Sequence, residues 1–220
     1  MRSDPVPRIQ AARYQSFAWP VGVNRQLVPR NRALELDLVA LLEQRQTRRD
    51  FNRPLEDAIL GEFLWLACRN RSSRPCPFGP DQESRVYPSA GAMHPIHVLV
   101  AREAMPWMRY DPVEHSLIEL PGSIDSAAAG RLAAGHLLNL EKGVLLGLVA
   151  EPGKTAAKYD RFESLVWRDA GVVLGYMSLV AEALGLAFCP LGISGRPHLT
   201  DYLPDPSPLH EIGFAVLGAG

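Results

Sequence analysis

Length, composition and charge limit the classes of protein to which this chain can belong. With 220 residues, 47% of them hydrophobic and 21% charged, the chain has the size and composition of one soluble globular domain. A formal net charge of −1 lacks the basic excess that nucleic acids and anionic membranes attract, and no apolar run approaches a membrane span.

The N-terminal part is predicted to hold an irregular arm, two helices and a loop. Residues 1–32 contain prolines and polar residues without periodicity, so we expect an arm there and a folded domain over 33–220. The leucines of ALELDLVALLEQR predict an amphipathic helix from Ala33 to near Arg45. A second helix is predicted within PLEDAILGEFLWLACRN, and RSSRPCPFGPDQES (71–84) is rich in loop-forming residues.

The C-terminal part alternates strands and helices without regular βαβ repetition, which predicts an α+β fold. Strands are expected at 96–101, 143–151 and 211–218, with a hairpin at 108–120 that turns at Asp111 and carries His115 on the surface. Helices are expected at 124–140 and at 160–186. The second helix is apolar around much of its circumference, which is typical of a core or a dimer interface.

Cysteine and histidine spacing argues against disulfides and metals. The chain has three cysteines, Cys68, Cys76 and Cys189, and none of them forms a CxxC pair. An odd number at wide spacing predicts neither a disulfide framework nor a zinc site, so the reducing cytoplasm is the expected location. The N-terminus lacks the apolar region of a secretory signal. His94 and His97 lie three residues apart in a strand-like stretch and would point to opposite faces, which predicts no metal site.

Two short segments have residue types that suit the binding of a ligand. RQTRRDF (45–51) follows a predicted helix, and its arginines and hydroxyl could hold a phosphate. Taken by itself, a charged helix end is the more common explanation of such a run. YPSAGAMHP places four small residues before a strand, where the backbone can approach a ligand closely; the alternative is a plain Pro/Gly loop.

Together with KYDR and ALGLAFCPLG, these segments resemble the flavin-dependent nitroreductase superfamily, and more narrowly its SagB-type, azoline-oxidising dehydrogenase branch, over roughly residues 38–217. The resemblance implies a mixed central sheet packed by helices with a long core helix, and FMN as cofactor. It implies that Arg45, Thr47 and Arg49 hold the FMN phosphate. It also implies a flavin-binding turn formed by Pro88, Ser89, Ala90 and Gly91. A loop with backbone donors near the flavin N5 and O4 would be formed by Cys189, Pro190, Leu191 and Gly192.

Lys158 and Tyr159 match the Lys-Tyr pair that marks the SagB-type branch, and the resemblance implies that they are catalytic. Dehydrogenation of an azoline requires a base at one carbon and a hydride acceptor opposite the other. A neighbouring ammonium favours the phenolate form of a tyrosine, so Tyr159 would be the base and Lys158 would tune it. Both can reach one substrate only at a bend or a helix start; a surface Lys-Tyr pair is the alternative.

The resemblance implies an FMN-dependent oxidoreductase that oxidises thiazoline, oxazoline or a similar saturated heterocycle to an azole in a peptide or natural product. The expected partners are a small-molecule or peptide substrate, a second copy with the flavin near the homodimer interface, and other subunits of a peptide-modifying complex. Two alternatives stay open: an NAD(P)H-dependent nitro or quinone reductase, and a non-catalytic scaffold subunit with weakened flavin binding. Gln46 in place of a basic residue and the absence of a C-terminal basic residue favour the scaffold.

Overall fold

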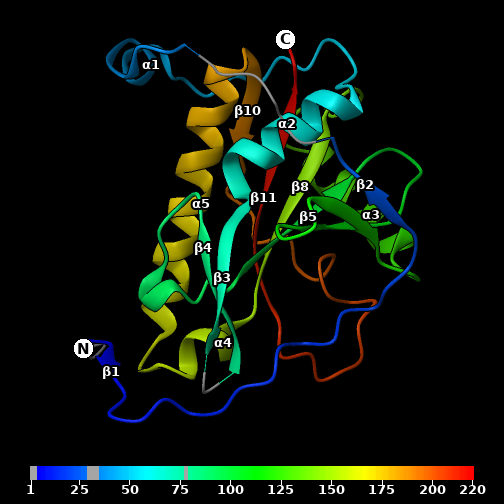
Figure 1. Cartoon of the computed structure of the whole chain (residues 1–220). Helices are drawn as coiled ribbons and strands as arrows, with labels where there is room; N and C mark the ends of the chain where they lie inside the picture. Colours follow the sequence, from blue (N-terminus) through cyan, green and yellow to red (C-terminus); the bar gives the residue numbers. More distant parts are fainter. Residues whose placement is uncertain (1–3, 29–34, 77–78) are drawn as a thin grey trace.

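The chain folds around a seven-stranded sheet with helices on both of its faces (Figure 1). The computed structural model describes residues 4–28, 35–76 and 79–220. The strand order is β10-β11-β8-β5-β6-β7-β2, with β2 at Asn24–Gln26, β5 at Ile96–Ala101, β6 at Met108–Asp111, β7 at Ser116–Glu119, β8 at Val144–Ala150, β10 at Leu186–Pro190 and β11 at His210–Ala219. The α+β class is confirmed. The sheet was expected to be mixed, but each pair of neighbouring strands in this order is antiparallel, an arrangement that allows short turns such as the one between β6 and β7.

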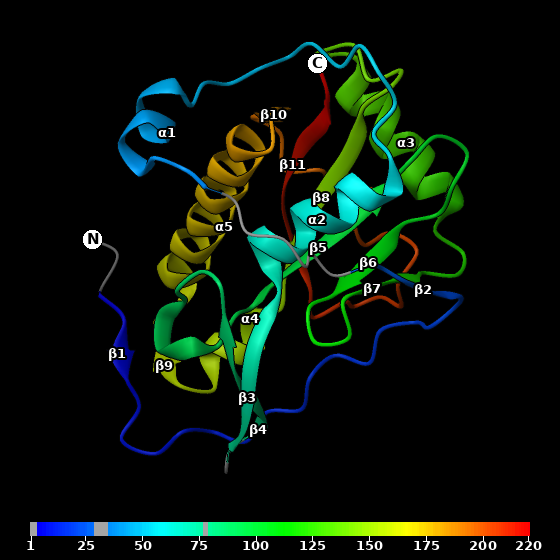
Figure 2. The ribbon, with the colours of Figure 1, turned by 45° about the horizontal axis from the view of Figure 1, so that its top comes forward.

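The helices divide between the two faces of the sheet (Figure 2). They are α1 at Leu38–Gln44, α2 at Asp57–Cys68, α3 at Ile124–Gly135, α4 at Pro152–Ala156 and α5 at Glu163–Ala183, with a short 3₁₀ helix η1 at Ala90–Ala92. One core packs α2 and α5 against the sheet, and the other packs α3 and the segment 193–209 against the opposite face. Of the helices in the described part of the chain, none combines the length and apolar character needed to cross a lipid bilayer.

Burial on both faces explains why the central strands read as continuous apolar runs. All seven residues of β8 are buried. Leu146 and Leu148 pack in the core with α2 and α5, whereas Leu145 and Val149 pack in the core with α3. A strand covered on both sides gains from apolar residues at every position, so its prediction from composition is confirmed.

Three predicted helices are shorter than expected, and their ends have local causes. The Asp37 side chain accepts hydrogen bonds from the Val39 and Ala40 N–H groups, so α1 begins at Leu38 rather than at Ala33, which lies outside the described residues. The long helix α5 has 21 residues and gives way at Gly185, whose φ of 66° favours glycine, to strand β10. The predicted helix over 124–140 likewise ends earlier, at Gly135.

The loop prediction for residues 71–84 is wrong. Strands β3 (Asn70–Cys76) and β4 (Gly79–Arg85) form an antiparallel hairpin beside α5 (Figure 1), and residues 77–78 between them lie outside the described residues. Most residues of β3 are exposed, and the hairpin gains a hydrogen bond of 2.8 Å from Arg74 Nε to Gln82 Oε1. A polar hairpin lacks the apolar alternation by which a strand is predicted.

The N-terminal arm, expected to be irregular, contributes two short strands. Its residues 24–26 form β2, which pairs with β7 at the edge of the main sheet. Residues 6 and 7 form β1 (Val6–Pro7), which pairs with β9 (Tyr159–Asp160). Residues 1–3 and 29–32 of the predicted arm lie outside the described residues. Both strands are exposed and have no hydrophobic pattern, so only their backbone pairing identifies them.

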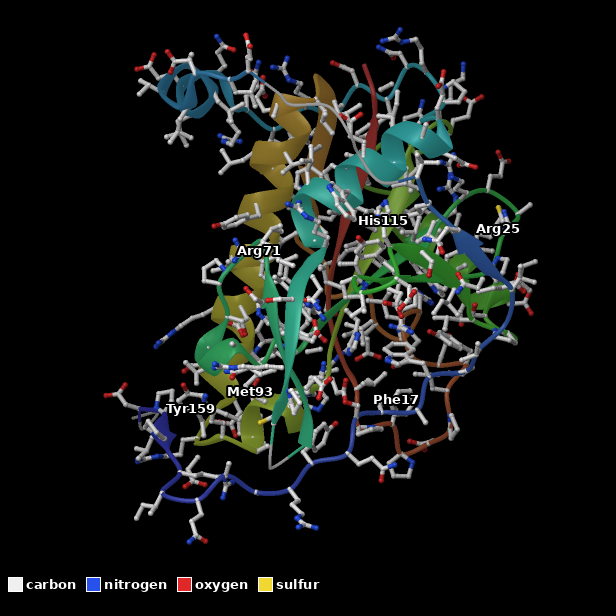
Figure 3. All side chains as sticks on the ribbon, viewed as in Figure 1. Phe17, Arg25, Arg71, Met93, His115 and Tyr159 are labelled. Carbon is white, nitrogen blue, oxygen red and sulfur yellow. The ribbon has the colours of Figure 1, made fainter. Side chains whose placement is uncertain are left out.

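His115, expected on the surface, is buried and only 3% exposed. Its ring lies 4.9 Å from that of Trp65 and its Nδ1 is 2.9 Å from the Tyr110 hydroxyl (Figure 3). The prediction failed because α2, which carries Trp65, covers the end of the hairpin on which His115 lies.

Candidate functional site

The small-residue turn before β5 has an unusual backbone. Three of its residues have left-handed φ values: Gly91 at 61°, Ala92 at 57° and His94 at 45°. This conformation is costly for residues other than glycine, and such outliers concentrate at functional sites because the surrounding structure must hold them. The turn therefore stands out as a candidate site on backbone geometry alone.

Asp169 of α5 holds this turn in place. The Ser89 hydroxyl donates to Asp169 Oδ2 at 2.6 Å and the Ala90 N–H donates to Oδ1 at 3.1 Å, while Ser89 Oγ accepts from the His94 N–H at 2.9 Å. Burial raises the pKa of Asp169, and the two hydrogen bonds oppose that rise. The sequence analysis assigned Pro88, Ser89 and Ala90 to flavin contacts. In the structure, the Ser89 hydroxyl and the Ala90 N–H are bonded to Asp169 instead, and Pro88 has no N–H to donate.

The predicted catalytic pair lies against the same turn. Lys158 Nζ donates to the Gly91 carbonyl at 3.1 Å, and a Cβ added at Gly91 would lie 2.8 Å from Lys158 Cδ and 3.0 Å from the Tyr159 hydroxyl. The pair follows α4 and enters β9, so it lies at a bend and not within a regular helix. The arm fixes this bend, because the Arg8 N–H donates to the Lys158 carbonyl and the Arg8 guanidinium pairs with Asp160 at 2.9 Å.

We expect Gly91→Ala to lower the free energy of unfolding by about 2–4 kcal/mol, because the left-handed backbone and the contact with Lys158 and Tyr159 both resist a methyl group. Urea denaturation measures the loss. Gly122→Ala is the matched control: its φ of 79° imposes a similar backbone cost, but a Cβ there meets no atom within 4 Å. Equal losses in the two variants would show that the packing on Gly91 is unimportant.

An open pocket of about 740 Å³, here called the hairpin pocket, lies beside the turn between β3, β4 and α5. Pro88, His94 and Tyr176 are among its lining residues. His94 is 3% exposed, and its Nδ1 has no hydrogen-bond partner within the described residues. Burial lowers the pKa of His94 to about 4, and the positive charge of Arg85 acts in the same direction. The pocket thus has a neutral imidazole in its wall at neutral pH.

The lowered pKa of His94 predicts a loss of stability in mild acid. Between its ordinary pKa near 6.5 and its folded value of about 4, the unfolded chain binds a proton that the folded chain does not, so stability falls as the pH falls. We expect His94→Asn, which tolerates the left-handed backbone, to reduce the loss between pH 7.5 and 5 by about 1–2 kcal/mol. Urea titrations at the two pH values measure it, with exposed His136→Gln as the control. An unchanged pH dependence in His94→Asn would contradict the assignment.

A second opening, here called the α5 groove, runs along α5 with a volume of about 600 Å³. Its lining residues are Arg45, Thr47, Pro88, Val172, Leu174, Gly175, Tyr176, Ser178, Leu179 and Pro190. Arg45 and Thr47 supply a cation and a hydroxyl, and Pro88 and Pro190 come from the predicted turn and the predicted loop. Pro88 and Tyr176 also line the hairpin pocket, so the two openings meet there.

The other arginines of the basic segment lie elsewhere. Arg49 lines a separate pocket with Gly220, which Thr47 also borders. Arg48 forms an ion pair of 2.6 Å with Glu182. Of the three residues predicted to hold a phosphate, the structure therefore brings Arg45 and Thr47 into the α5 groove and places Arg49 outside its lining.

The predicted loop 189–192 contributes unequally to the groove. Cys189 is buried in the core on the α3 side, and its thiol donates to the Pro190 carbonyl at 3.5 Å. The Leu191 N–H donates to the Phe214 carbonyl at 2.8 Å. Gly192 is exposed, and its N–H makes no hydrogen bond within residues 4–28, 35–76 and 79–220. Of this loop, Pro190 lines the groove and Gly192 keeps a free donor.

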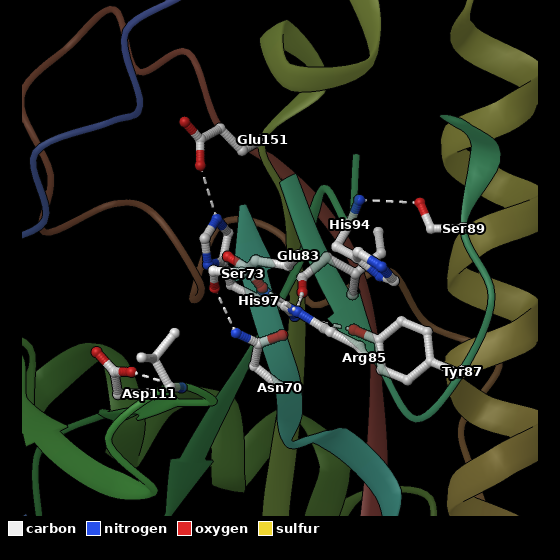
Figure 4. A network of polar contacts seen from close by, with 12 residues as sticks. Asn70, Ser73, Glu83, Arg85, Tyr87, Ser89, His94, His97, Asp111 and Glu151 are labelled. Carbon is white, nitrogen blue, oxygen red and sulfur yellow. Dashed lines mark hydrogen bonds and ion pairs between the residues drawn. The ribbon is translucent and has the colours of Figure 1, made fainter. Parts of the chain in front are cut away.

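A buried polar cluster around Glu151 was not predicted. Glu151 accepts hydrogen bonds from the Tyr14 hydroxyl at 2.8 Å and the Phe17 N–H at 2.7 Å, and its other oxygen lies 2.8 Å from His97 Nε2 (Figure 4). Burial alone would raise the pKa of Glu151, but the His97 hydrogen bond and the Lys154 charge hold it at about 2. The only sequence signal was a glutamate at the end of an apolar strand.

Comparison with known proteins places this geometry in context. The model of the nitroreductase family matches residues 42–216. A protein from Ralstonia eutropha JMP134 assigned as a nitroreductase has a similar structure, with a TM-score of 0.66, 22% identity and coverage of 99% of this chain and 97% of that chain. No curated protein matches the chain in sequence.

Two further solved structures share the fold. The Escherichia coli microcin synthetase complex McbBCD, solved with truncated pro-MccB17 bound, has a TM-score of 0.59 and 17% identity over 89% of this chain and 78% of that chain. A Desulfovibrio desulfuricans protein assigned as a nitroreductase, solved in complex with FMN, has a TM-score of 0.52 and 20% identity over 84% and 86% of the two chains. At these identities the similarity establishes the fold.

Proposed function

Because this chain belongs to the nitroreductase family, we propose that it binds FMN in the α5 groove and is an FMN-dependent oxidoreductase. The observation that carries this proposal is the convergence of Arg45, Thr47, Pro88 and Pro190 on one groove from three distant segments of the chain. The FMN complex of the Desulfovibrio protein, which shares the fold, supports the choice of cofactor.

The groove fits an elongated ligand with a charged end. Arg45 can form a charge-assisted hydrogen bond with a phosphate, and the Thr47 hydroxyl can add a donor. Gly175 leaves the floor of the groove open, because a Cβ there meets no atom within 4 Å. Arg49 would reach the phosphate only by reorienting, so Arg45 and Thr47 would hold the cofactor's charged end.

We further propose that the substrate is a thiazoline, oxazoline or similar saturated heterocycle, which the enzyme oxidises to an azole. Bound FMN would supply the hydride acceptor. Tyr159 would remove the proton from the substrate, because its hydroxyl lies 3.0 Å from the position of a Cβ at Gly91, in the same turn as Pro88, which lines both the α5 groove and the hairpin pocket. Lys158, whose Nζ donates a hydrogen bond to the Gly91 carbonyl, would fix the position of the turn relative to the Tyr159 side chain.

The proposed partners are a peptide or small-molecule substrate and a second copy of this chain. Helix α1 has no buried residue, and Leu38, Val39 and Leu42 on it are exposed, which supports a partner surface over this helix. Trp167 on α5 is 55% exposed. The similarity of fold to a subunit of the peptide-bound McbBCD complex supports membership of a peptide-modifying assembly. A cytoplasmic location is part of the proposal, since all three cysteines are free.

Two alternatives use the same fold. An NAD(P)H-dependent nitro or quinone reductase would use the same groove without needing Tyr159. A scaffold subunit with weakened flavin binding is favoured by the positions of Arg48 and Arg49, which leave Arg45 as the one arginine of this segment that lines the groove. Azoline turnover by the FMN-loaded protein without NAD(P)H would support the dehydrogenase, turnover of nitro compounds only with NAD(P)H would support the reductase, and failure to bind FMN would support the scaffold.

A further inference from the structure

A small polar cavity, here called the arm cavity, lies beneath the N-terminal arm and apart from the α5 groove. It has a volume of about 210 Å³ and no lining residue in common with that groove. Phe17 and Trp19 of the arm form one side, with His97 of β5 against Trp19 at a ring distance of 5.2 Å. Arg109 of β6 and Lys154 of α4 also line it. The cavity is smaller than the pockets of about 300–1,000 Å³ that hold drug-sized ligands, so it suits a small molecule.

Several hydrogen-bond donors of this cavity have no partner. Lys154 is only 6% exposed, and within the described residues its ammonium makes no hydrogen bond and no ion pair. Arg109 Nε and Trp19 Nε1 are buried and likewise unpartnered. The nearest carboxylate oxygen to the Arg109 guanidinium, that of Asp111, is 3.7 Å away, beyond hydrogen-bond distance. Lys154 is attracted by the charges of Glu83 and Glu151, but a buried donor without a hydrogen bond is unfavourable, so the unpartnered Arg109 Nε and Trp19 Nε1 require an explanation.

Each carboxylate that lines this cavity makes at least one hydrogen bond or ion pair. Both oxygens of Glu151 are bonded, one to Tyr14 and Phe17 and the other to His97. Glu83 pairs with Arg85 at 2.6 Å. Asp111 Oδ1 accepts from the N–H groups of its own turn, those of Val113 and Glu114. The charges of the lining balance, with Glu83, Asp111 and Glu151 against Arg85, Arg109 and Lys154. What the cavity offers a ligand is therefore its unpartnered donors, Arg109 Nε and Trp19 Nε1, beside the Lys154 ammonium.

We propose that the arm cavity binds a small organic carboxylate. The carboxylate group would accept hydrogen bonds from Lys154 and Arg109, and the body of the ligand would lie against Phe17 and Trp19. A planar carboxylate can meet a guanidinium and an ammonium together, and the aromatic rings offer an apolar wall that a hydrated inorganic ion does not use. Because Lys154 and the proposed catalytic pair lie on one short segment, with the arm packed over it, the bound carboxylate would tie the arm to α4.

The experiment is calorimetric titration of the full chain with benzoate, with benzamide as the uncharged ligand of the same shape and phosphate as the inorganic anion. Wild-type protein is expected to bind benzoate at one saturable site, and Lys154→Met and Arg109→Leu to bind it about 10–100-fold more weakly. Lys142→Met, which alters an exposed lysine, is expected to bind as wild type does. No saturable benzoate binding, equal binding of benzamide, or tighter binding of phosphate would each overturn the proposal.

Thermal unfolding without ligand separates a binding role of Lys154 from a structural one. Because the Lys154 ammonium is buried without a hydrogen bond in the ligand-free chain, Lys154→Met is expected to raise the Tm by about 2–4 °C. A lysine that stabilises the ligand-free fold would instead give a lower Tm on the same substitution, and that result would overturn the proposal. FMN binding does not enter this readout, so failure of the flavin proposal would leave it interpretable.

Discussion

Tyr159→Phe is expected to lower the rate of azoline oxidation by about 10²–10⁴-fold while FMN stays bound. The phenylalanine ring keeps the packing against Gly91, since the contacts there include the ring carbon Cε2 as well as the hydroxyl. The substitution removes only the group that would accept the substrate proton. Steady-state oxidation of a thiazoline substrate by the FMN-loaded enzyme, followed by chromatography of the azole product, measures the effect.

A matched control comes from another tyrosine of the chain. Tyr202 has a buried hydroxyl with no hydrogen-bond partner among the described residues, and it packs against the core on the α3 side. Tyr202→Phe therefore makes the same chemical change away from the proposed site, and we expect its azoline oxidation to match the wild type. If Tyr159→Phe kept wild-type azoline turnover, Tyr159 would not be the base. If it kept NAD(P)H-driven nitro reduction and the wild type oxidised no azoline, the reductase alternative would gain.

Gly175→Leu is expected to weaken FMN binding by about 10–100-fold and to raise the stability of the chain without FMN. Gly175 lines the α5 groove, and a Cβ there meets no protein atom within 4 Å, so a leucine side chain would occupy space in the groove. Overpacking of a site costs about 1–3 kcal/mol, which gives the stated loss of affinity. In a helix interior, glycine is about 1 kcal/mol less favourable than alanine, and the helix propensity of leucine is close to that of alanine. The substitution is therefore expected to stabilise helix α5 itself.

The control for this variant lies one turn earlier on the same helix. Gly171 is exposed, a Cβ there also meets no atom within 4 Å, and it is not among the residues that line the groove. Gly171→Leu is therefore expected to gain stability in the same way and to bind FMN as wild type does. FMN fluorescence titration and thermal unfolding of both variants give the two readouts. Wild-type affinity in Gly175→Leu would show that the cofactor does not occupy this groove.

The sequence predicted the parts of the fold that periodicity and burial determine. Strand β8 is buried on both faces and has the apolar composition of a central strand, and α5 has a clear helical pattern. Asn24–Gln26 and the β3–β4 hairpin were missed because they are polar and exposed, and backbone pairing leaves no trace in side-chain pattern. The sheet's antiparallel pairing likewise depends on contacts between distant strands.

The candidate site was predictable in its components and less so in their arrangement. The family resemblance named both Gly91 and the Lys158–Tyr159 pair, and the structure brings them into contact. The hydrogen bond from the Ser89 hydroxyl to Asp169 was missed because the two residues are 80 positions apart, and a local sequence pattern does not reveal such contacts. The same reason hid the arm contacts of Glu151, which span more than a hundred residues.

The central claim is that segments far apart in this chain form one FMN site along α5. Fluorescence titration of FMN with the full-length protein, combined with the visible absorbance of the repurified complex, tests it most directly. The account predicts saturable quenching at a single site per chain and a yellow protein that keeps its flavin through gel filtration. A colourless protein with no saturable quenching in excess FMN would contradict it.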